Sequence, residues 1–130
     1  MPKDQRISCA FCEISSEPNL VAANALAFAL RDTSPVTPLH TLILPRRHVG
    51  NYFELTAAEH GAIRQLLKQV RNDILNADLS VEGFNLGVNV GATAGQTIFH
   101  CHIHLIPRRH GDVDNPRGGV RAIIPGKQLY

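Results

Sequence analysis

The segment between Phe99 and Pro107 places a histidine at every second position, with apolar residues between the histidines. The histidines are His100, His102 and His104, and the intervening and following residues are Cys101, Ile103 and Leu105. Successive side chains of a β-strand point to opposite faces, so residues two apart share a face and lie about 6.6 to 7 Å apart. The pattern predicts a strand over residues 98–106. It turns its apolar set toward a core and its imidazoles toward the opposite face, where a ligand can bind.

A helical periodicity predicts the element that covers the apolar face of this strand. Thr56 and Glu59 form a capping box, in which each side chain accepts a hydrogen bond from the other residue's backbone N–H. Apolar residues then recur at helical spacing, at Ile63, Leu66, Leu67, Val70 and Ile74. Further short strands are expected at 26–31, 40–46 and 83–90. The predicted fold class is α+β, with a mainly antiparallel sheet covered by a helix on one face.

Length and composition are those of one globular domain spanning residues 1–130. Apolar residues make up 44% and charged residues 18% of the chain, which is unlike the composition of a disordered protein. A net charge of +2 argues against long nucleic acids as partners. Residues 1–6 lack the apolar core of a signal peptide, and no run approaches the roughly 18 apolar residues of a membrane helix. We therefore expect a cytoplasmic protein without a membrane partner.

Three chemical interpretations of the histidine run remain open at this point. A half-exposed sheet face can carry polar residues that happen to be histidine. A zinc site made from all three rings is a second interpretation, but neighbouring same-face imidazoles on one strand bring at most two nitrogens to one metal, and a catalytic zinc needs three protein ligands. In the third interpretation, the run divides its histidines between a metal and catalysis.

Cys9 and Cys12 form a Cys-x-x-Cys pair near the beginning of the sequence. This is the spacing of a structural zinc knuckle, and such a site needs two further ligands because no second pair of this kind is present. A pair of free thiols and a redox pair are the alternatives.

A loop of small residues, Gly91 to Gly95, precedes the histidine run. Its glycines let backbone N–H groups approach an anion closely, and Gln96 and Thr97 add side-chain donors. Alone the loop is a weak signal, because a structural turn has the same composition.

The histidine run resembles the signature of the histidine triad family, His-φ-His-φ-His-φ-φ, where φ is apolar. Further landmarks stand in the family's order, namely Asp32 with Ser34-Pro35, the segment Pro38 to His48, and the segment Asn89 to Thr97. The resemblance covers about residues 7 to 110. It implies a HIT-like α+β fold with a mainly antiparallel five-stranded sheet, covered by one long and one short helix. It also implies an N-terminal zinc segment at about 7–14 and a C-terminal loop tail at about 108–130.

The resemblance implies covalent catalysis by the histidines. The family's middle histidine attacks the α-phosphate of a nucleotide and forms a nucleotidyl-imidazole that water hydrolyses, a role that falls here on His102. A neutral imidazole is a fair nucleophile at pH 7. His104 would donate to a non-bridging phosphate oxygen or to the leaving group. Transferase relatives carry glutamine at this third position, so His104 favours a hydrolase.

Substrate contacts are also implied by the resemblance. The family residue that accepts from both ribose hydroxyls corresponds to Asp32, with a turn-forming aspartate before Thr-Ser-Pro as the alternative. Asn89 resembles a phosphate-side contact, with a plain polar strand residue as the alternative. The loop residues Gly95, Gln96 and Thr97, together with His104, complete the expected substrate site.

A structural zinc is the cofactor that the resemblance implies. Relatives with the N-terminal cysteine pair complete a tetrahedral zinc site with two histidines that correspond to His48 and His100. The expected ligands are therefore Cys9, Cys12, His48 and His100. In this arrangement His100 serves as a ligand and fixes the strand beside His102.

The resemblance further implies a homodimeric hydrolase of small nucleotides. Dinucleoside polyphosphates rank first, because Pro107 to Arg109 followed by Gly111-Asp112 look closer to that branch. Nucleoside phosphoramidates are the alternative substrates, and a regulatory nucleotide-binding module with little catalysis is the alternative class. In the tail, Arg117 or Arg121 is expected to reach a phosphate chain. His40, His60 and His110 receive no role.

Overall fold

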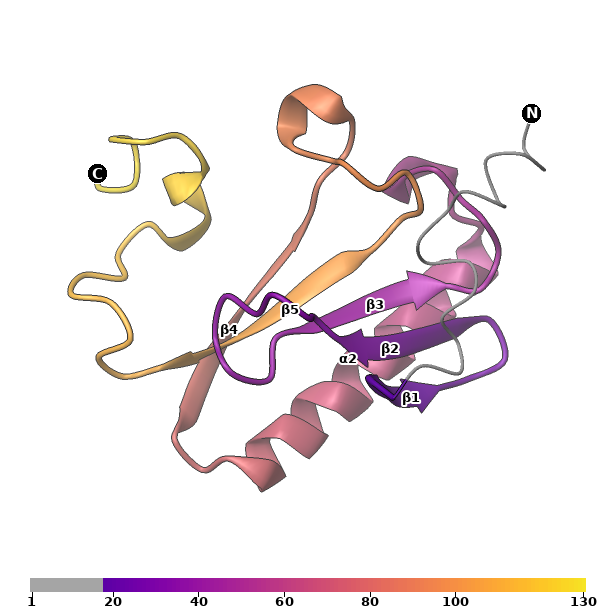
Figure 1. Cartoon of the computed structure of the whole chain (residues 1–130), viewed down its shortest axis with the longest axis horizontal. Coiled ribbons are helices and arrows are strands. Elements are labelled where there is room, and N and C mark those ends of the chain that lie inside the picture. The colour runs from indigo at the N-terminus through magenta and orange to yellow at the C-terminus, as the bar shows by residue number, and fades with distance from the viewer. Residues whose placement is uncertain (1–17) are drawn as a thin grey trace.

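The computed structural model describes residues 18–130, and its strands form one antiparallel sheet in the order β1-β2-β3-β5-β4 (Figure 1). The strands are β1 (Leu20–Ala23), β2 (Ala27–Arg31), β3 (Thr41–Pro45), β4 (Val81–Val88) and β5 (Ile103–Arg109). The predicted five-stranded antiparallel sheet is confirmed. The strand that carries the last of the three histidines lies between β3 and β4.

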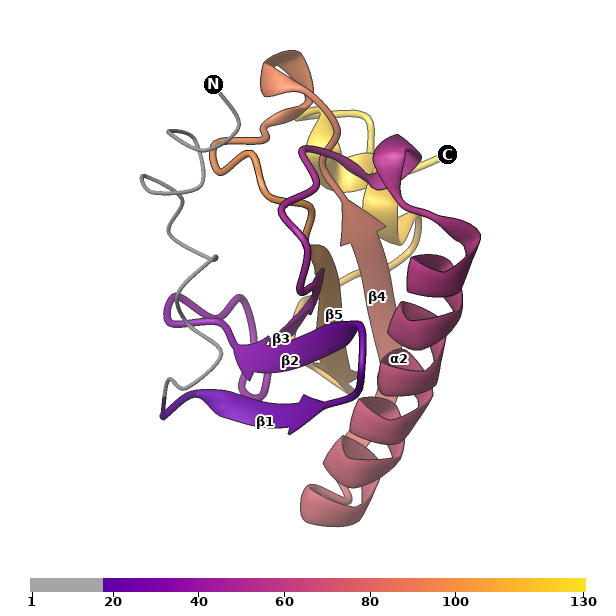
Figure 2. The same ribbon diagram turned by 90° about the vertical axis from the view of Figure 1, so that its right-hand side faces the viewer.

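One long helix, α2 (Ala57–Ala77), lies across one face of the sheet (Figure 2). The predicted capping box begins it, with the Thr56 hydroxyl accepting from the Glu59 N–H at 3.1 Å and the Glu59 carboxylate accepting from the Thr56 N–H at 2.9 Å. The predicted apolar positions Ile63, Leu66, Val70 and Ile74 are buried in the core between helix and sheet. Burial of one such side chain contributes about 1.5 to 3 kcal/mol, so this helix face is a main source of stability.

The alternation in β5 puts the apolar residues on the helix side, as predicted. Ile103, Leu105 and Pro107 are buried, whereas His104 and Arg108 are half-buried on the face away from α2. Of the cross-strand neighbours on β4, Gly87 stands opposite His104, and a Cβ atom built on that glycine meets no atom within 4 Å. The face that carries His104 is therefore not covered by the helix.

The strand predicted over 98–106 begins later than expected, and this is a correction. Residues 98–102 are not in a strand, and β5 instead runs from Ile103 to Arg109. Its pairing with β3 stops at Ile43↔Ile103, two residues before Pro45. Pro45 has no N–H to donate to a ladder, and its carbonyl accepts from the His100 ring at 2.8 Å. The backbone of the first two histidines is therefore outside the regular sheet.

Other differences from the prediction lie at the edges of the fold. The strand β1, Leu-Val-Ala-Ala, has no polar–apolar alternation in its sequence and was not predicted, and β5 ends at Arg109, near the expected start of the tail. Within residues 18–130, α2 is the one α-helix, accompanied by three 3₁₀ segments: η1 (Tyr52–Glu54), η2 (Ala92–Ala94) and η3 (Gly119–Ile123). The short helix expected from the resemblance is not found in that part of the chain. No helix among the described residues is long and apolar enough to cross a membrane.

Candidate active site and metal-ligand pair

The ring of His102 is held in one tautomer by the backbone. Its Nδ1 lies 2.8 Å from the carbonyl oxygen of His100. A carbonyl oxygen can only accept, so Nδ1 carries the proton and donates it. In the neutral ring the lone pair is therefore on Nε2. The His104 ring lies beside it, with 5.3 Å between the two ring centroids.

His104 belongs to a second chain of hydrogen bonds, which runs through His40. The backbone N–H of Val36 donates to His40 Nδ1 at 3.0 Å, and His40 Nε2 lies 2.9 Å from His104 Nδ1. Because His40 Nδ1 is an acceptor, the proton of the neutral ring is on Nε2, and it is donated to His104 Nδ1. By the same rule His104 carries its own proton on Nε2.

Burial keeps these rings uncharged. It lowers the pKa of His104 to about 4, an effect reinforced by the neighbouring imidazoles of His102 and His40 and opposed by Asp32. His40 is 2% exposed, and burial lowers its pKa, opposed by Asp32. Both rings are therefore neutral at pH 7, which agrees with the hydrogen-bond directions.

Asp32 forms the turn that one interpretation of the sequence expected. One of its carboxylate oxygens accepts from the backbone N–H of Ser34 at 2.8 Å, and the other lies 3.6 Å from His40 Nε2. The carboxylate thus stands at the edge of the histidine cluster. Its expected contact with ribose stays a prediction.

Asp32, His40 and His104 lie close enough to hold a cation, with their ligand atoms within 4.8 Å of one another. Two observations argue for hydrogen bonding instead. The proton on His40 Nε2 occupies the lone pair that a metal would need. The 2.9 Å separation of the two ring nitrogens is also shorter than the roughly 3.3 Å between two nitrogen ligands of a tetrahedral zinc with bonds of about 2.0 Å.

His48 and His100 form a separate pair of rings, which are perpendicular with 5.2 Å between their centroids. His100 is fully buried, and its Nε2–H donates to the Pro45 carbonyl at 2.8 Å, which puts the lone pair on Nδ1. Metal-ligating histidines usually donate their second ring nitrogen to a carbonyl or carboxylate in this way. The two histidines therefore fit a zinc site. Cys9 and Cys12, the other expected ligands, lie outside the described residues.

An ion pair that sequence reasoning did not anticipate fixes the segment that carries His48. The Arg47 guanidinium donates to both carboxylate oxygens of Glu59, at 2.9 and 2.8 Å. Hydrogen bonds from Arg47, with further ones from Thr56, lower the pKa of Glu59 to about 2. Glu59 therefore caps α2 and also holds the chain next to His48. The capping motif revealed the first role, whereas nothing in the sequence indicated the second.

The loop before the histidines has the backbone that its glycines allow. Gly91 and Gly95 have φ angles of 90° and 98°, a region that favours glycine. Gln96 is buried, and its amide accepts from the Gly91 N–H and donates to the carbonyls of Gly50 and Ile98. Both donors of the Gln96 amide thus hold the loop, and a contact of Gln96 with a phosphate stays a prediction.

Asn89 and Thr97 flank this loop and are exposed. The Asn89 amide lies 4.0 Å from the position of a Cβ atom built on Gly95, so the two residues are neighbours as expected of a shared site. Their contacts with a substrate stay predictions.

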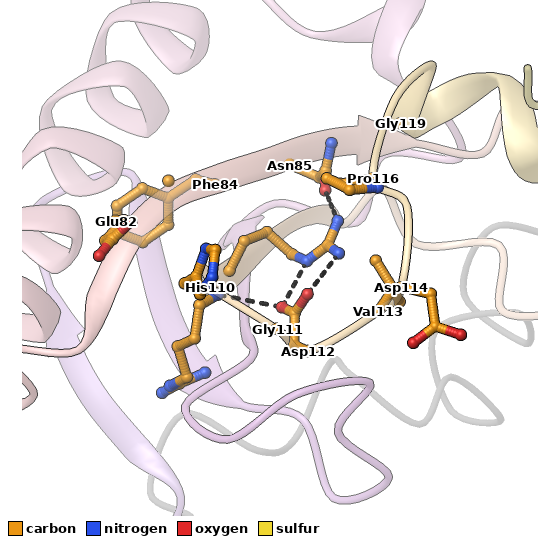
Figure 3. Close-up of a pocket in the computed structure, with 13 residues that line it drawn as sticks. Glu82, Phe84, Asn85, His110, Gly111, Asp112, Val113, Asp114, Pro116 and Gly119 are labelled. Carbon is orange, nitrogen blue, oxygen red and sulfur yellow. Dashed lines mark hydrogen bonds and ion pairs between the residues drawn. The ribbon is translucent and has the colours of Figure 1, made fainter.

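A cavity of about 600 Å³ lies at the other end of β5 (Figure 3). Its lining comes from the first half of β4, the end of β5 and the loop that follows, and includes none of the three run histidines. Arg108 crosses it, donating to Asn85 and to both oxygens of Asp112. The Arg108 guanidinium is therefore already paired with other residues of the lining.

The two arginines of the C-terminal tail contact an aromatic ring rather than the histidine site. The guanidinium carbons of Arg117 and Arg121 lie 4.6 and 5.1 Å from the centroid of the Tyr130 ring. The tail lies beyond the β4 side of the sheet, away from β1 (Figure 1). A phosphate contact by either arginine stays a prediction.

Together these features define a class: a small α+β domain with an imidazole-based site on the sheet face away from its helix. Residues 14–111 match the HIT domain family, and the chain belongs to that family.

Relatives of known name and structure agree with this assignment. The chain is similar to the adenylylsulfatase HINT3 of Arabidopsis thaliana, with 37% identity over 80% of this chain and 54% of that protein. It is also similar to a bifunctional bis(5'-adenosyl)-triphosphatase/adenylylsulfatase of the same plant, with 34% identity over 71% of this chain and 51% of that protein. The chain spans about half the length of these two relatives. Among solved structures, a Zn-bound histidine triad family protein from Mycobacterium smegmatis aligns with a TM-score of 0.74 and 29% identity, over 82% of this chain and 79% of that one.

Proposed function

We propose that this protein is a nucleotide hydrolase that acts at an α-phosphate through a covalent nucleotidyl-histidine on His102. The observation that carries the proposal is the hydrogen bond from His102 Nδ1–H to the His100 carbonyl, which leaves the lone pair of the neutral ring on Nε2. A nucleophile oriented by a fixed acceptor on its other nitrogen is the arrangement that covalent catalysis by histidine needs.

The reaction proceeds in two displacements. The Nε2 lone pair bonds to phosphorus while the bond from phosphorus to the leaving group breaks, and the leaving group departs with that electron pair. The positive charge that develops on the ring is stabilised by the His100 carbonyl at Nδ1–H. Water then bonds to phosphorus, the P–N bond breaks, its electron pair returns to Nε2, and a proton passes to solvent.

The substrate is held by the residues around this ring. His104 donates from Nε2–H toward the phosphate, Asp32 accepts from the ribose hydroxyls, and Asn89 contacts the phosphate side. The backbone N–H groups near Gly95 and the Thr97 hydroxyl face the same anion. Gln96 supports them indirectly by holding the loop in shape.

Dinucleoside polyphosphates are the substrates we rank first. The bis(5'-adenosyl)-triphosphatase activity in the name of one Arabidopsis relative supports this ranking. Both plant relatives are named as adenylylsulfatases, so adenylyl sulfate belongs in the same test. Nucleoside phosphoramidates are the alternative, and a nucleotide-binding regulatory module with little catalysis is the alternative of another class.

We further propose a structural zinc held by Cys9, Cys12, His48 and His100. The buried His100 ring with its Pro45 partner and the Zn-bound relative support this ligand set. Bound there, zinc would crosslink the N-terminal segment to the segment before β5 and take no part in the chemistry. Thiolate ligands are maintained in a reducing compartment, which is consistent with a cytoplasmic protein.

A homodimer completes the proposal. Among the described strands β4 is at the edge of the sheet and pairs only with β5, and its Leu86 is 51% exposed. An open strand edge with an exposed apolar residue favours pairing with another chain. We propose that a second copy of this protein pairs at this edge.

The decisive experiment compares the purified protein with His102→Ala on diadenosine tetraphosphate, adenylyl sulfate and adenosine phosphoramidate. We expect hydrolysis by the wild type and a loss of about 10⁴-fold or more in the variant, because the nucleophile is gone. Binding of AMP by both proteins, without hydrolysis of any compound by the wild type, would favour the binding module instead.

A further inference from the structure

Arg109, the last residue of β5, connects two segments that lie outside the sheet. Its Nη2 donates to the Pro38 carbonyl at 3.0 Å, and its Nε and Nη2 donate to one carboxylate oxygen of Asp78 at 3.2 and 2.9 Å. We infer that Arg109 is a positioning residue for ribose recognition, because it fastens the 32–40 loop, which carries Asp32, to the end of α2. The inference rests on the proposed function through the role of Asp32.

The Asp78 end of this connection is fixed by the fold. Asp78 ends α2, with its backbone N–H donating to the Ile74 carbonyl at 2.9 Å. Its second carboxylate oxygen accepts from the backbone N–H and the hydroxyl of Ser80, at 2.9 and 2.6 Å. Hydrogen bonds from Ser80 and Arg109 lower the pKa of Asp78 to about 2, so the carboxylate is charged at pH 7. Asp78 therefore presents a fixed anion to the guanidinium.

The other end of the connection is a strained part of the 32–40 loop. The Thr37 hydroxyl donates to the Pro107 carbonyl at 2.6 Å, and Arg109 holds the next residue, Pro38, by its carbonyl. Leu39 follows with a φ of 72°, a left-handed conformation that is unfavourable for a non-glycine residue. Such strain persists only where surrounding contacts fix the backbone. The end of β5 supplies two of these contacts, one of them from the Arg109 side chain.

Asp32 depends on the same loop for its direction. Its carboxylate accepts from the Ser34 N–H at 2.8 Å, and its backbone N–H donates to the His40 carbonyl at 2.9 Å. Residues 33–36 are exposed, so the hydrophobic core does not hold them in place. A displacement of the loop would therefore move the acceptor that we propose for ribose, and small displacements of a positioning group are costly in catalysis.

Stability alone does not explain an arginine at this position. The Arg109 side chain is 15% exposed, and its Nη1 is buried without a hydrogen-bond partner among the described residues. An unpaired buried N–H group is unfavourable, and replacing a buried ion pair with an apolar residue is often neutral for stability. The Asp78 carboxylate is 32% exposed, so water can hydrate it in a variant that lacks the guanidinium. Holding the loop accounts for Arg109 better than stabilising the fold does.

Substrate discrimination tests the positioning role. We compare kcat/KM for the nucleotide that the wild type hydrolyses best with kcat/KM for its 2',3'-dideoxy counterpart, which lacks the ribose hydroxyls. The wild type is expected to prefer the ribose compound, and Arg109→Leu to lose about 10-fold of that preference, since a misdirected acceptor forfeits a hydrogen bond to a charged group. Asp32→Asn should lose the preference as well. The double variant should lose no more than Asp32→Asn, because both changes remove one interaction.

Two further variants separate positioning from general damage to the fold. Arg109→Lys keeps the charge but not the planar fork, so it can reach Asp78 or Pro38 without holding both, and its ribose preference should lie between wild type and Arg109→Leu. The matched control is Arg71→Leu, which replaces an exposed arginine of α2 and should leave the preference unchanged. Thermal unfolding should give similar midpoints for both leucine variants. An equal loss of kcat/KM on the ribose and dideoxy compounds in Arg109→Leu would show an effect on folding and overturn the inference.

The two proposals fail separately. If the wild type hydrolyses a nucleotide and Arg109→Leu keeps the full ribose preference, the inference is wrong although the proposed function stands. If the wild type hydrolyses none of the compounds, the hydrolase proposal fails, and the dissociation constants of AMP and 2',3'-dideoxy-AMP supply the same ratio for each variant. A wild type without any ribose preference in hydrolysis or binding would contradict the role of Asp32, and the inference with it.

Discussion

The two histidine pairs of this protein use the same side chain in opposite ways. In the pair His40–His104 the ring nitrogens bond to each other at 2.9 Å, and the direction is set by a backbone N–H. In the pair His48–His100 the rings stand perpendicular, and the His100 proton goes to a backbone carbonyl. The main-chain partner thus determines which ring nitrogen keeps its lone pair. The first pair is suited to donate a hydrogen bond to substrate, and the second to bind a metal.

Replacing one histidine of each pair with alanine should give the largest difference between the two pairs. We expect His100→Ala to lose the zinc and about 3 kcal/mol or more of stability, because a cavity forms and a buried carbonyl loses its donor. His40→Ala should also destabilise the fold but keep about one zinc per chain. Elemental analysis with thermal unfolding checks both. Equal metal loss in the two variants would show that the pairs do not differ as proposed.

The pH dependence of stability tests the assignment of His104 as a buried, neutral ring. The pKa of His104 in the folded protein, about 4, lies below its usual value of 6.5. Between these two pH values the unfolded chain binds a proton that the folded protein does not bind. The stability of the fold therefore decreases as the pH drops from about 6.5 to about 4. The contribution amounts to at most about 2 kcal/mol at pH 5. Urea unfolding at pH 7 and pH 5 should show a smaller loss in His104→Gln than in the wild type. An equal loss in both would contradict the assignment to this ring.

The ion pair between Arg47 and Glu59, next to His48, should have a moderate effect on stability. Glu59→Gln removes the charge that pairs with Arg47 and is expected to cost about 1 to 2 kcal/mol, since Glu59 is buried while Arg47 is half exposed. Because the pKa of Glu59 is lowered to about 2, the contribution is present above about 4.5 and is lost as pH falls toward 2. Urea unfolding measures it. Zinc affinity should weaken in this variant and remain unchanged in Glu54→Gln.

The tail arginines should have the smallest effect of all. Replacing Arg117 and Arg121 together with alanine is expected to raise KM for a dinucleoside polyphosphate a few-fold with kcat unchanged, if either leaves Tyr130 to contact a phosphate chain. Steady-state kinetics measures this. An unchanged KM would show that neither arginine contacts the substrate.

The helix α2 and the strand β5 were predictable because their apolar residues recur at regular spacings in the sequence. The capping box and the spacing of Ile63 to Ile74 located α2, and the period-two pattern identified the core-facing residues of β5. The sequence did not reveal where β5 begins, because that depends on Pro45 in a strand distant along the chain. It also did not reveal the roles of His40 and Arg47. His40 contacts His104, 64 residues further along the chain, and Arg47 contacts Glu59, 12 residues further. Such individual contacts leave no periodic signal in the sequence.

The hydrogen bond from the Val36 backbone also determines which substitutions position 36 tolerates. The Val36 side chain is 70% exposed, and the group that orients His40 is its amide N–H, which every residue except proline possesses. A saturation library should therefore accept almost any side chain at position 36 and reject proline alone. The side chain at this position is therefore expendable, although the positions of the ring protons of His40 and His104 depend on its backbone N–H.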